Sequence, residues 1–169
     1  MRGSSLFLVA ASLALLAAGC GKDSRASTGG GDPGKPVATA DCGHTVCGSN
    51  FFIDSAPVGK CTVGQTCSVA MTLVATGEFH INDEYPYKFK ADDAADVRFL
   101  GTDPAGSAVF SKQAGSWQKS DEKKGVMTVT FQATSKAPRT IAGTFKLSVC
   151  SAQNCQLEQQ QVSTTVAVQ

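Results

Sequence analysis

The stretch IAGTFKLSV, residues 141–149, decides the fold because apolar and polar side chains alternate along it. Successive residues of a β-strand point to opposite faces, so this stretch predicts a strand with one apolar face. Phe145, Leu147 and Val149 would lie on that face, and the hydroxyl and lysine side chains between them would point to solvent. A helix would scatter the apolar residues around its axis.

Residues 67–75 and 127–133 have the same alternation. The three apolar faces predict a core made of Val69, Met71, Leu73, Met127, Val129, Phe131, Phe145, Leu147 and Val149. Shorter strands are expected at residues 50–54, 87–90, 97–100, 107–111 and 162–168. Together these segments predict an all-β antiparallel sandwich of about eight strands. The charged segment 111–125, which contains Trp117, is expected to be a long loop.

The chain begins with an apolar run, residues 6–18, that is too short to span a bilayer and follows Arg2. Its end, LAAGC at residues 16–20, resembles a bacterial lipobox. We therefore expect residues 1–19 to be a lipoprotein signal peptide and Cys20 to carry the lipid that anchors the protein to a bilayer. An ordinary secretory signal cut nearby is the alternative.

Residues 20–40 are rich in Gly, Ser and charged residues and almost free of apolar side chains. Such a segment buries too little surface to offset its ordering entropy, so we expect a flexible tether. The residue after Cys20 is Gly21, whereas an aspartate at this position would favour retention in the inner membrane. The glycine therefore favours anchoring of the protein in the outer membrane, facing the periplasm. The protein is thus expected to be a lipid-anchored component of the cell envelope.

The charges of the chain exclude some partners. The 15 basic side chains include Arg2 in the leader, so the mature chain would carry 14 basic and 14 acidic side chains. Scattered charges without net excess give no footprint for nucleic acid, and we expect no nucleic-acid partner. The sequence contains no phosphate-binding loop, serine nucleophile motif or calcium loop, and we expect no cofactor.

Six cysteines follow the leader as three close pairs, Cys42/Cys47, Cys61/Cys67 and Cys150/Cys155. Thiols outside the cytoplasm oxidise, so we expect nearest-neighbour disulfides. Pairing of Cys42 with Cys61 and of Cys47 with Cys67 is the main alternative. The first two pairs would be structural disulfides in a cysteine-rich extension, residues 41–65, before a sandwich domain of residues 66–169. Zinc bound by Cys42, His44 and Cys47 is a weaker alternative, and we expect no metal site.

Cys150 and Cys155 are separated by four residues that can form a hairpin loop. Paired α-carbons across a hairpin lie close enough for a disulfide. One interpretation is a structural disulfide that stabilises the hairpin. The other is an exchangeable redox pair, because an exposed hairpin disulfide offers a reachable sulfur to an attacking thiolate.

The stretch TGEFHINDEYPYKF, residues 76–89, followed later by AGTFKLSVC at residues 142–150 and by Cys155, resembles the N-terminal periplasmic domain of the DsbD-type thiol:disulfide interchange reductases. The resemblance covers roughly residues 66–168 and implies an immunoglobulin-like sandwich. It also implies that Cys150 and Cys155 are catalytic and pass electrons to or from another periplasmic or membrane thiol:disulfide protein. Phe110 or Trp117 could then serve as the aromatic cap that shields such a pair. The alternative function is a non-catalytic, disulfide-stabilised envelope lipoprotein.

His80 lies in this stretch, between apolar residues. We expect a hydrogen-bonded residue of the sandwich rather than a catalytic base, although imidazole can serve either role.

Overall fold

The structure, a computed structural model, describes residues 42–169. These residues form eleven strands and no helix, and therefore no helix that could cross a membrane. The strands are β1 (Val46–Cys47), β2 (Phe51–Val58), β3 (Thr66–Ala75), β4 (His80–Ile81), β5 (Lys88–Ala91), β6 (Val97–Phe99), β7 (Val109–Ser111), β8 (Trp117–Lys119), β9 (Lys124–Ala133), β10 (Arg139–Cys150) and β11 (Cys155–Val166). The predicted leader, the lipid-bearing Cys20 and the tether lie outside the described residues.

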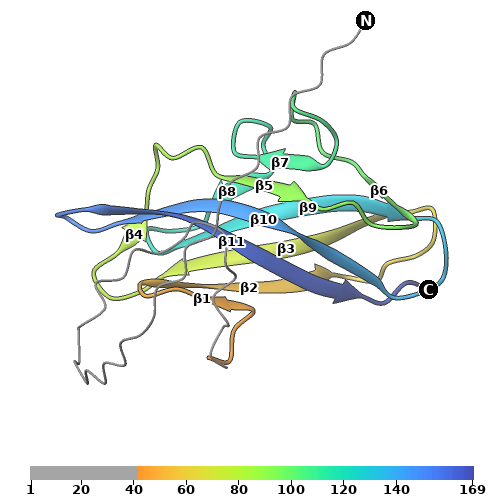
Figure 1. Cartoon of the computed structure of the whole chain (residues 1–169), viewed down its shortest axis with the longest axis horizontal. Helices are drawn as coiled ribbons and strands as arrows, with labels where there is room; N and C mark the ends of the chain where they lie inside the picture. The colour runs from red at the N-terminus through yellow and green to blue at the C-terminus, as the bar shows by residue number, and fades with distance from the viewer. Residues whose placement is uncertain (1–41) are drawn as a thin grey trace, which may run out of the picture. The chain divides into compact units, whose positions relative to one another are not determined.

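The strands form two antiparallel sheets (Figure 1). The six-stranded sheet has the order β1-β2-β3-β9-β6, and β8 also pairs with β9. The five-stranded sheet has the order β11-β10-β5-β7, and β4 also pairs with β10. The predicted all-β, immunoglobulin-like antiparallel sandwich is confirmed, with eleven strands in place of about eight.

The predicted core is confirmed. All nine side chains assigned to it from alternation are fully buried, at 0% exposure. In the six-stranded sheet Met71 pairs with Met127 and Val69 with Val129, so the apolar faces of β3 and β9 lie in register. A shift of one residue would turn each strand's apolar set to solvent, and burial of these side chains therefore fixes the register.

The expectation of a long loop over residues 111–125 is wrong. Residues 117–119 form β8, and Trp117 is only 6% exposed. Its ring stacks on that of Tyr87 with centroids 4.1 Å apart. Gly125 on β9, the Cα partner of Lys119, leaves space for this ring, since a Cβ atom there would overlap the indole. Most of the neighbouring charged residues belong to the turn between β8 and β9. They make the average polarity of the segment high, so this average does not indicate that Trp117 is buried.

The disulfide-bearing N-terminal segment, described from residue 42 onward, contributes β1 and β2 to the six-stranded sheet. The whole of β2 pairs with β3, and its residues Phe51 and Ile53 are buried. Cys61 forms a parallel bridge with Val168 near the end of the chain. The Cys42–Cys47 and Cys61–Cys67 pairs therefore lie on a strand-bearing part of the domain, with Cys67 on β3.

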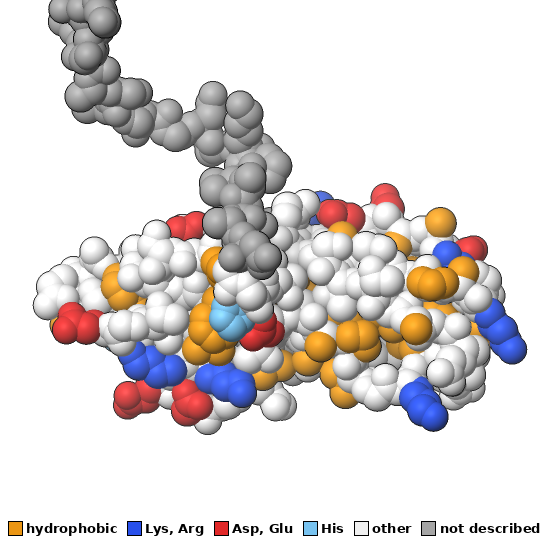
Figure 2. All heavy atoms as spheres, turned by 90° about the horizontal axis from the view of Figure 1, so that it is seen from below, with side chains coloured by type: hydrophobic (Ala, Val, Ile, Leu, Met, Phe, Trp, Pro, Cys, Tyr) orange, Lys and Arg blue, Asp and Glu red, His pale blue; other side chains and the backbone are white. Residues whose placement is uncertain are grey.

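Surface charge has no dominant sign on the face shown in Figure 2, where acidic and basic side chains lie scattered among uncharged groups. This agrees with the nearly balanced composition. Any site for a charged ligand must therefore depend on a local arrangement of side chains and not on the net charge.

Candidate functional site

The cysteines form three nearest-neighbour disulfides, Cys42–Cys47, Cys61–Cys67 and Cys150–Cys155. The predicted pairing is confirmed, and the alternative that crossed the first two pairs is wrong. The zinc alternative is also wrong, because Cys42 and Cys47 are bonded to each other and cannot offer thiolates to a metal. Among residues 42–169 no group of His, Cys, Asp or Glu side chains is arranged to hold a metal ion.

The Cys150–Cys155 disulfide closes the hairpin of β10 and β11, whose end projects beyond the other strands (Figure 1). The amide of Ser151 donates a hydrogen bond to the carbonyl of Asn154 at 2.8 Å. The cysteines are the next pair along the ladder, with their α-carbons 4.0 Å apart. In an antiparallel ladder the pair beside a hydrogen-bonded pair has closer α-carbons, and this is where a cross-strand disulfide fits.

The two cysteines differ in their access to solvent. Cys150 is only 5% exposed, whereas Cys155, on the edge strand of the five-stranded sheet, is exposed. Thiol–disulfide exchange requires a collinear approach of a thiolate to one sulfur, so access decides which sulfur is attacked. The geometry favours attack at Cys155 and departure of Cys150.

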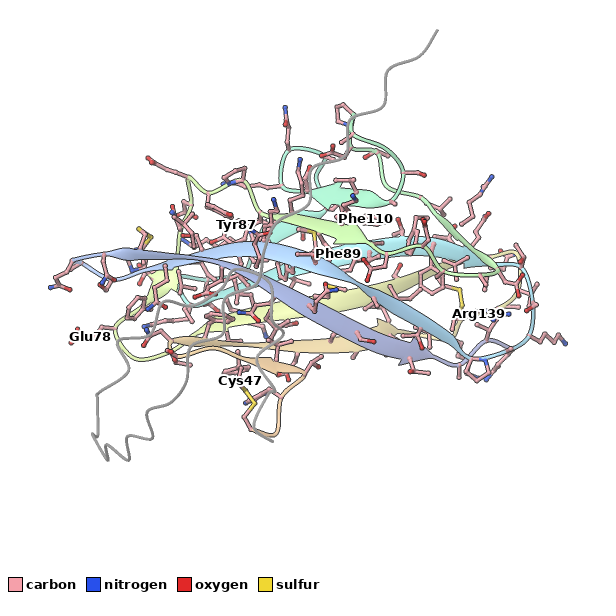
Figure 3. All side chains as sticks on the ribbon, in the orientation of Figure 1. Cys47, Glu78, Tyr87, Phe89, Phe110 and Arg139 are labelled. Atoms are coloured by element: carbon pink, nitrogen blue, oxygen red, sulfur yellow. A yellow bond between two sulfur atoms is a disulfide. The ribbon has the colours of Figure 1, made fainter. Side chains whose placement is uncertain are left out.

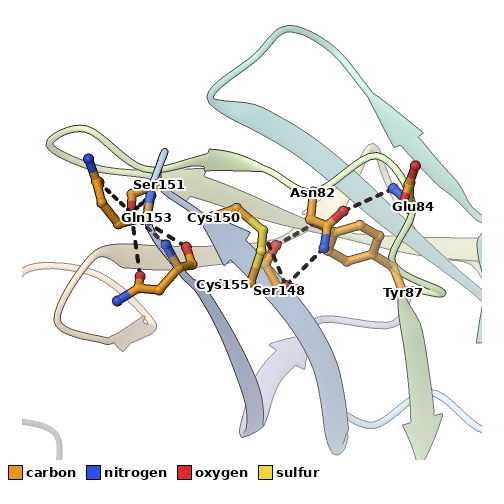
Figure 4. Close-up of a disulfide and its surroundings, with 9 residues drawn as sticks. Asn82, Glu84, Tyr87, Ser148, Cys150, Ser151, Gln153 and Cys155 are labelled. Carbon is orange, nitrogen blue, oxygen red and sulfur yellow. Dashed lines mark hydrogen bonds between the residues drawn. A yellow bond between two sulfur atoms is a disulfide. The ribbon is translucent and has the colours of Figure 1, made fainter.

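A polar cluster lies beside the sulfur of Cys150 (Figure 4). The Ser148 hydroxyl is 4.0 Å from this sulfur, within reach of a weak hydrogen bond. The Asn82 amide donates to the same hydroxyl oxygen at 3.3 Å. Because that oxygen already accepts a hydrogen bond, its own hydrogen is available to the sulfur.

Tyr87 holds the backbone next to this cluster. Its hydroxyl donates to the carbonyl oxygen of Ser148 at 2.6 Å. Burial raises the pKa of Tyr87, so the phenol stays protonated and remains a donor. The bond joins the start of β5 to the end of β10 and fixes the position of Ser148 relative to the disulfide.

His80 lies directly across from Cys150. Strand β4 pairs with β10 so that His80 is the Cα partner of Cys150, and Ile81 is the partner of Val149. Directly opposed residues of antiparallel strands point to the same face of the sheet. His80 is exposed and Ile81 is buried, so His80 lies on the outer face of a strand of the sandwich. Cys150 is thus flanked by Cys155 on one neighbouring strand and by His80 on the other.

The pairing of His80 with Cys150 is not predictable from the sequence, because a two-residue strand is too short for an alternating pattern and His80 is far from Cys150 along the chain. The only available signal was the place of His80 in the stretch that resembles the reductase family.

The aromatic residues expected to cap the disulfide lie elsewhere. Phe110 is 1% exposed, and its ring contacts those of Phe89 and Phe99. Trp117 packs edge-on against Phe145 as well as against Tyr87. Figure 3 shows Tyr87, Phe89 and Phe110 together on and beside β5 and β7. These rings form the interior of the sandwich, and the expectation of a cap at Phe110 or Trp117 is wrong.

The other two disulfides have different surroundings. Cys61 and Cys67 are both buried, at 4% and 3% exposure, and lie in the core. A disulfide without access to solvent cannot meet an attacking thiolate, so the burial of this pair is consistent with the predicted structural role. Cys42 is exposed, and near it His44 stacks on Phe52 at 3.7 Å between ring centroids and contacts the carboxylate of Asp54 at 2.9 Å.

Comparison with known proteins gives neighbours by structure only. No family model and no curated protein matches the chain. A cohesin module from a family 33 glycoside hydrolase of Clostridium perfringens covers 70% of this chain and 95% of its own, with 8% identity and a TM-score of 0.41. AggA, the major subunit of the aggregative adherence fimbriae type I of Escherichia coli, covers 75% of this chain and 99% of its own, with 10% identity and a TM-score of 0.34. Likenesses of this size do not bear on function.

Proposed function

We propose that the protein is a membrane-tethered thiol:disulfide exchange module of the cell envelope that works through Cys150 and Cys155. Its partner is another envelope protein with a reactive cysteine pair, and its anchor is the lipid on Cys20. The observation that carries the proposal is the environment of Cys150. It is a buried cysteine bonded to an exposed one, and it has a serine hydroxyl near its sulfur and a histidine as its strand partner.

The reaction is a two-step exchange. A thiolate of the partner attacks the sulfur of Cys155, a bond forms between these two sulfurs, and the Cys150–Cys155 bond breaks with its electron pair on Cys150. The second thiolate of the partner then attacks the partner's own sulfur in the mixed disulfide and releases Cys155 as a thiolate. The partner is oxidised by two electrons, and Cys150 and Cys155 are reduced and take up two protons. The same steps in reverse pass electrons to the partner.

The groups around Cys150 support its role as the leaving sulfur. A thiolate is stabilised by hydrogen-bond donors and by nearby positive charge. The Ser148 hydroxyl and an imidazole N–H of His80 can supply such donors, since both residues lie on the side of the sheet that carries the disulfide. A lower basicity of the leaving thiolate speeds exchange.

Single-cysteine variants in cells test the proposal. Cys150→Ala leaves the exposed Cys155 to form a mixed disulfide that Cys150 can no longer resolve, so a covalent complex should accumulate on non-reducing gels. Cys155→Ala leaves only the buried Cys150 and should accumulate much less. Cys42→Ala, which also leaves one unpaired cysteine, is the matched control for unspecific capture.

The outcome is decided by mass spectrometry of the trapped complex. The proposal predicts a dithiol protein joined to Cys155 and released by dithiothreitol. Equal amounts of trapped complex in Cys150→Ala and Cys42→Ala, or no complex in either variant, would contradict the proposal.

A second candidate function has its own supporting observation. The disulfide closes the projecting end of the β10–β11 hairpin, and β11 is the edge strand of its sheet. A covalent bond at this place would hold the edge strand to its neighbour and stabilise the hairpin. In that case the protein is a non-catalytic envelope lipoprotein stabilised by three disulfides. The Cys150→Ala experiment separates the two functions, because a structural disulfide traps no partner.

A further inference from the structure

The outer face of the five-stranded sheet carries a groove of about 400 Å³ that the exchange reaction does not use. It lies across β5, β7, β10 and β11, which are neighbours in the sheet (Figure 1). Its lining is Lys88, Lys90, Ala105, Val109, Thr144, Lys146 and Gln159. Three ammonium groups and two polar side chains thus surround a small concave surface.

The register brings like charges together. Lys146 and Lys88 are Cα partners on β10 and β5, and Lys90 is two residues from Lys88 on the same face. Like charges directly opposite each other on antiparallel strands are destabilising. A lysine pair at this position costs stability in the free protein, and a bound anion would remove that cost.

The carboxylates near the groove do not neutralise these lysines. In the described part of the chain none of the three lysines forms a salt bridge. Asp103 is close enough to Lys88 to feel its charge, but its oxygens already accept hydrogen bonds from the Ser111 hydroxyl and the Ala105 amide. Asp92 continues the row of outward residues on this strand and forms no salt bridge either.

We propose that this groove binds a phosphate group carried by a larger molecule, with Lys88, Lys90 and Lys146 as its cationic ligands. Several ammonium groups match the double charge and the acceptor oxygens of a phosphate monoester. Gln159 can add an amide donor, whereas the hydroxyl of Thr144 already donates to Gln161 at 2.9 Å. The groove is wider than one oxyanion, so a sugar or a glycerol unit attached to the phosphate fits beside Val109.

Nuclear magnetic resonance of the full chain in detergent tests the site with three soluble probes: inorganic phosphate, glucose 6-phosphate and glycerol 3-phosphate. Saturable shifts of the backbone amides of Lys88, Lys90, Thr144 and Lys146 are expected. Tighter binding of glucose 6-phosphate than of glycerol 3-phosphate would indicate a phosphorylated saccharide, and the reverse order a lipid head group. Absence of saturable shifts with all three probes would overturn the proposal.

Two variants make the test specific. Lys146→Gln should weaken binding about tenfold, as expected for loss of one charge-assisted hydrogen bond. Lys136→Gln, at an exposed lysine outside the groove, should bind as the wild type does. Lys146→Gln should also melt no lower than the wild type in phosphate-free buffer, because the substitution removes the repulsion with Lys88. Equal affinity of the two variants would show that any binding is unspecific.

Discussion

His80 and Cys150 face each other across antiparallel strands, as Cα partners of β4 and β10. The pairing places an exposed imidazole on the same side of the sheet as a buried sulfur whose disulfide partner, Cys155, is open to solvent. The relationship depends on β4, a two-residue strand that follows the turn after β3. It places an imidazole side chain on the strand next to Cys150.

His80→Gln should slow alkylation of the reduced Cys150 by iodoacetamide at pH 6 to 7. Loss of the imidazole beside the sulfur lowers the thiolate fraction, and the rate should fall about two- to fivefold. The rate is measured on the unfractionated protein by mass spectrometry of the peptide that contains Cys150. His44→Gln, at the other histidine of the chain, is the control and should leave the rate at Cys150 unchanged. An unchanged alkylation rate in His80→Gln would show that His80 does not affect the reactivity of Cys150.

Phe145→Ala should lower the free energy of unfolding by about 3 to 5 kcal/mol, the usual cost of deleting a buried aromatic side chain. Phe145 is fully buried, faces Phe89 across the ladder and contacts Trp117. Urea unfolding measures the loss. Thr165→Ala, at an exposed position of β11, should change stability by less than about 0.5 kcal/mol. A loss below about 1 kcal/mol in Phe145→Ala would show that this face of β10 is not core.

Asp103 should make stability fall in acid. Its pKa is lowered below 3.8, mainly because the Ser111 hydroxyl donates to the carboxylate and also because the Ala105 amide does. The stabilisation is therefore complete above pH 3.8, the unfolded-state value, and disappears as the pH falls through the lower folded-state pKa. Urea unfolding between pH 2 and 5 measures the slope.

In Asp103→Asn this slope should become shallower, and Ser111→Ala should flatten it as well by removing the main donor. Asp83, whose pKa is lowered chiefly by a hydrogen bond from Lys119, accounts for part of the slope that remains. If both variants keep the wild-type dependence of unfolding free energy on pH, the acid sensitivity does not come from Asp103.

Cys20 should be the first residue of the mature protein and should carry the lipid. The expectation rests on the lipobox-like LAAGC at residues 16–20. Mass spectrometry of the N-terminal peptide from a membrane fraction measures it, and Cys20→Ala should release the protein from that fraction. An unacylated N-terminus that begins at another residue would contradict the anchor.

The sequence predicted most of the strands but not all of them. The short strands β5, β6 and β7 lie at the predicted segments 87–90, 97–100 and 107–111, whereas β1, β4 and β8 were not predicted and β11 begins at Cys155, well before the predicted start at residue 162. Strands β3, β9 and β10 have ten or more residues, and alternation over that length identifies a buried face. Strand β8 has three residues beside a charged turn, so tertiary packing on Tyr87, and not local pattern, buries Trp117.

The candidate site was predictable in part. The spacing of Cys150 and Cys155 suits a hairpin, and a hairpin disulfide follows from the covalent geometry alone. The roles of His80, Ser148 and Asn82 depend on which strand lies next to β10, and strand order is set by the packing of the whole domain. The cap predicted at Phe110 or Trp117 failed for the same reason, since large aromatic rings gain more from burial in the core than from covering a surface disulfide.

The measurement that tests the central claim most directly is a redox titration of the full chain, with each cysteine pair followed separately by alkylation and mass spectrometry. The exchange function predicts that Cys150–Cys155 is half reduced at about −180 to −270 mV, in the range of thiol:disulfide exchange proteins. The buried Cys61–Cys67 should stay oxidised there and provides the internal control. If Cys150–Cys155 also stays oxidised down to about −300 mV or below, it is a structural disulfide and the exchange function is wrong.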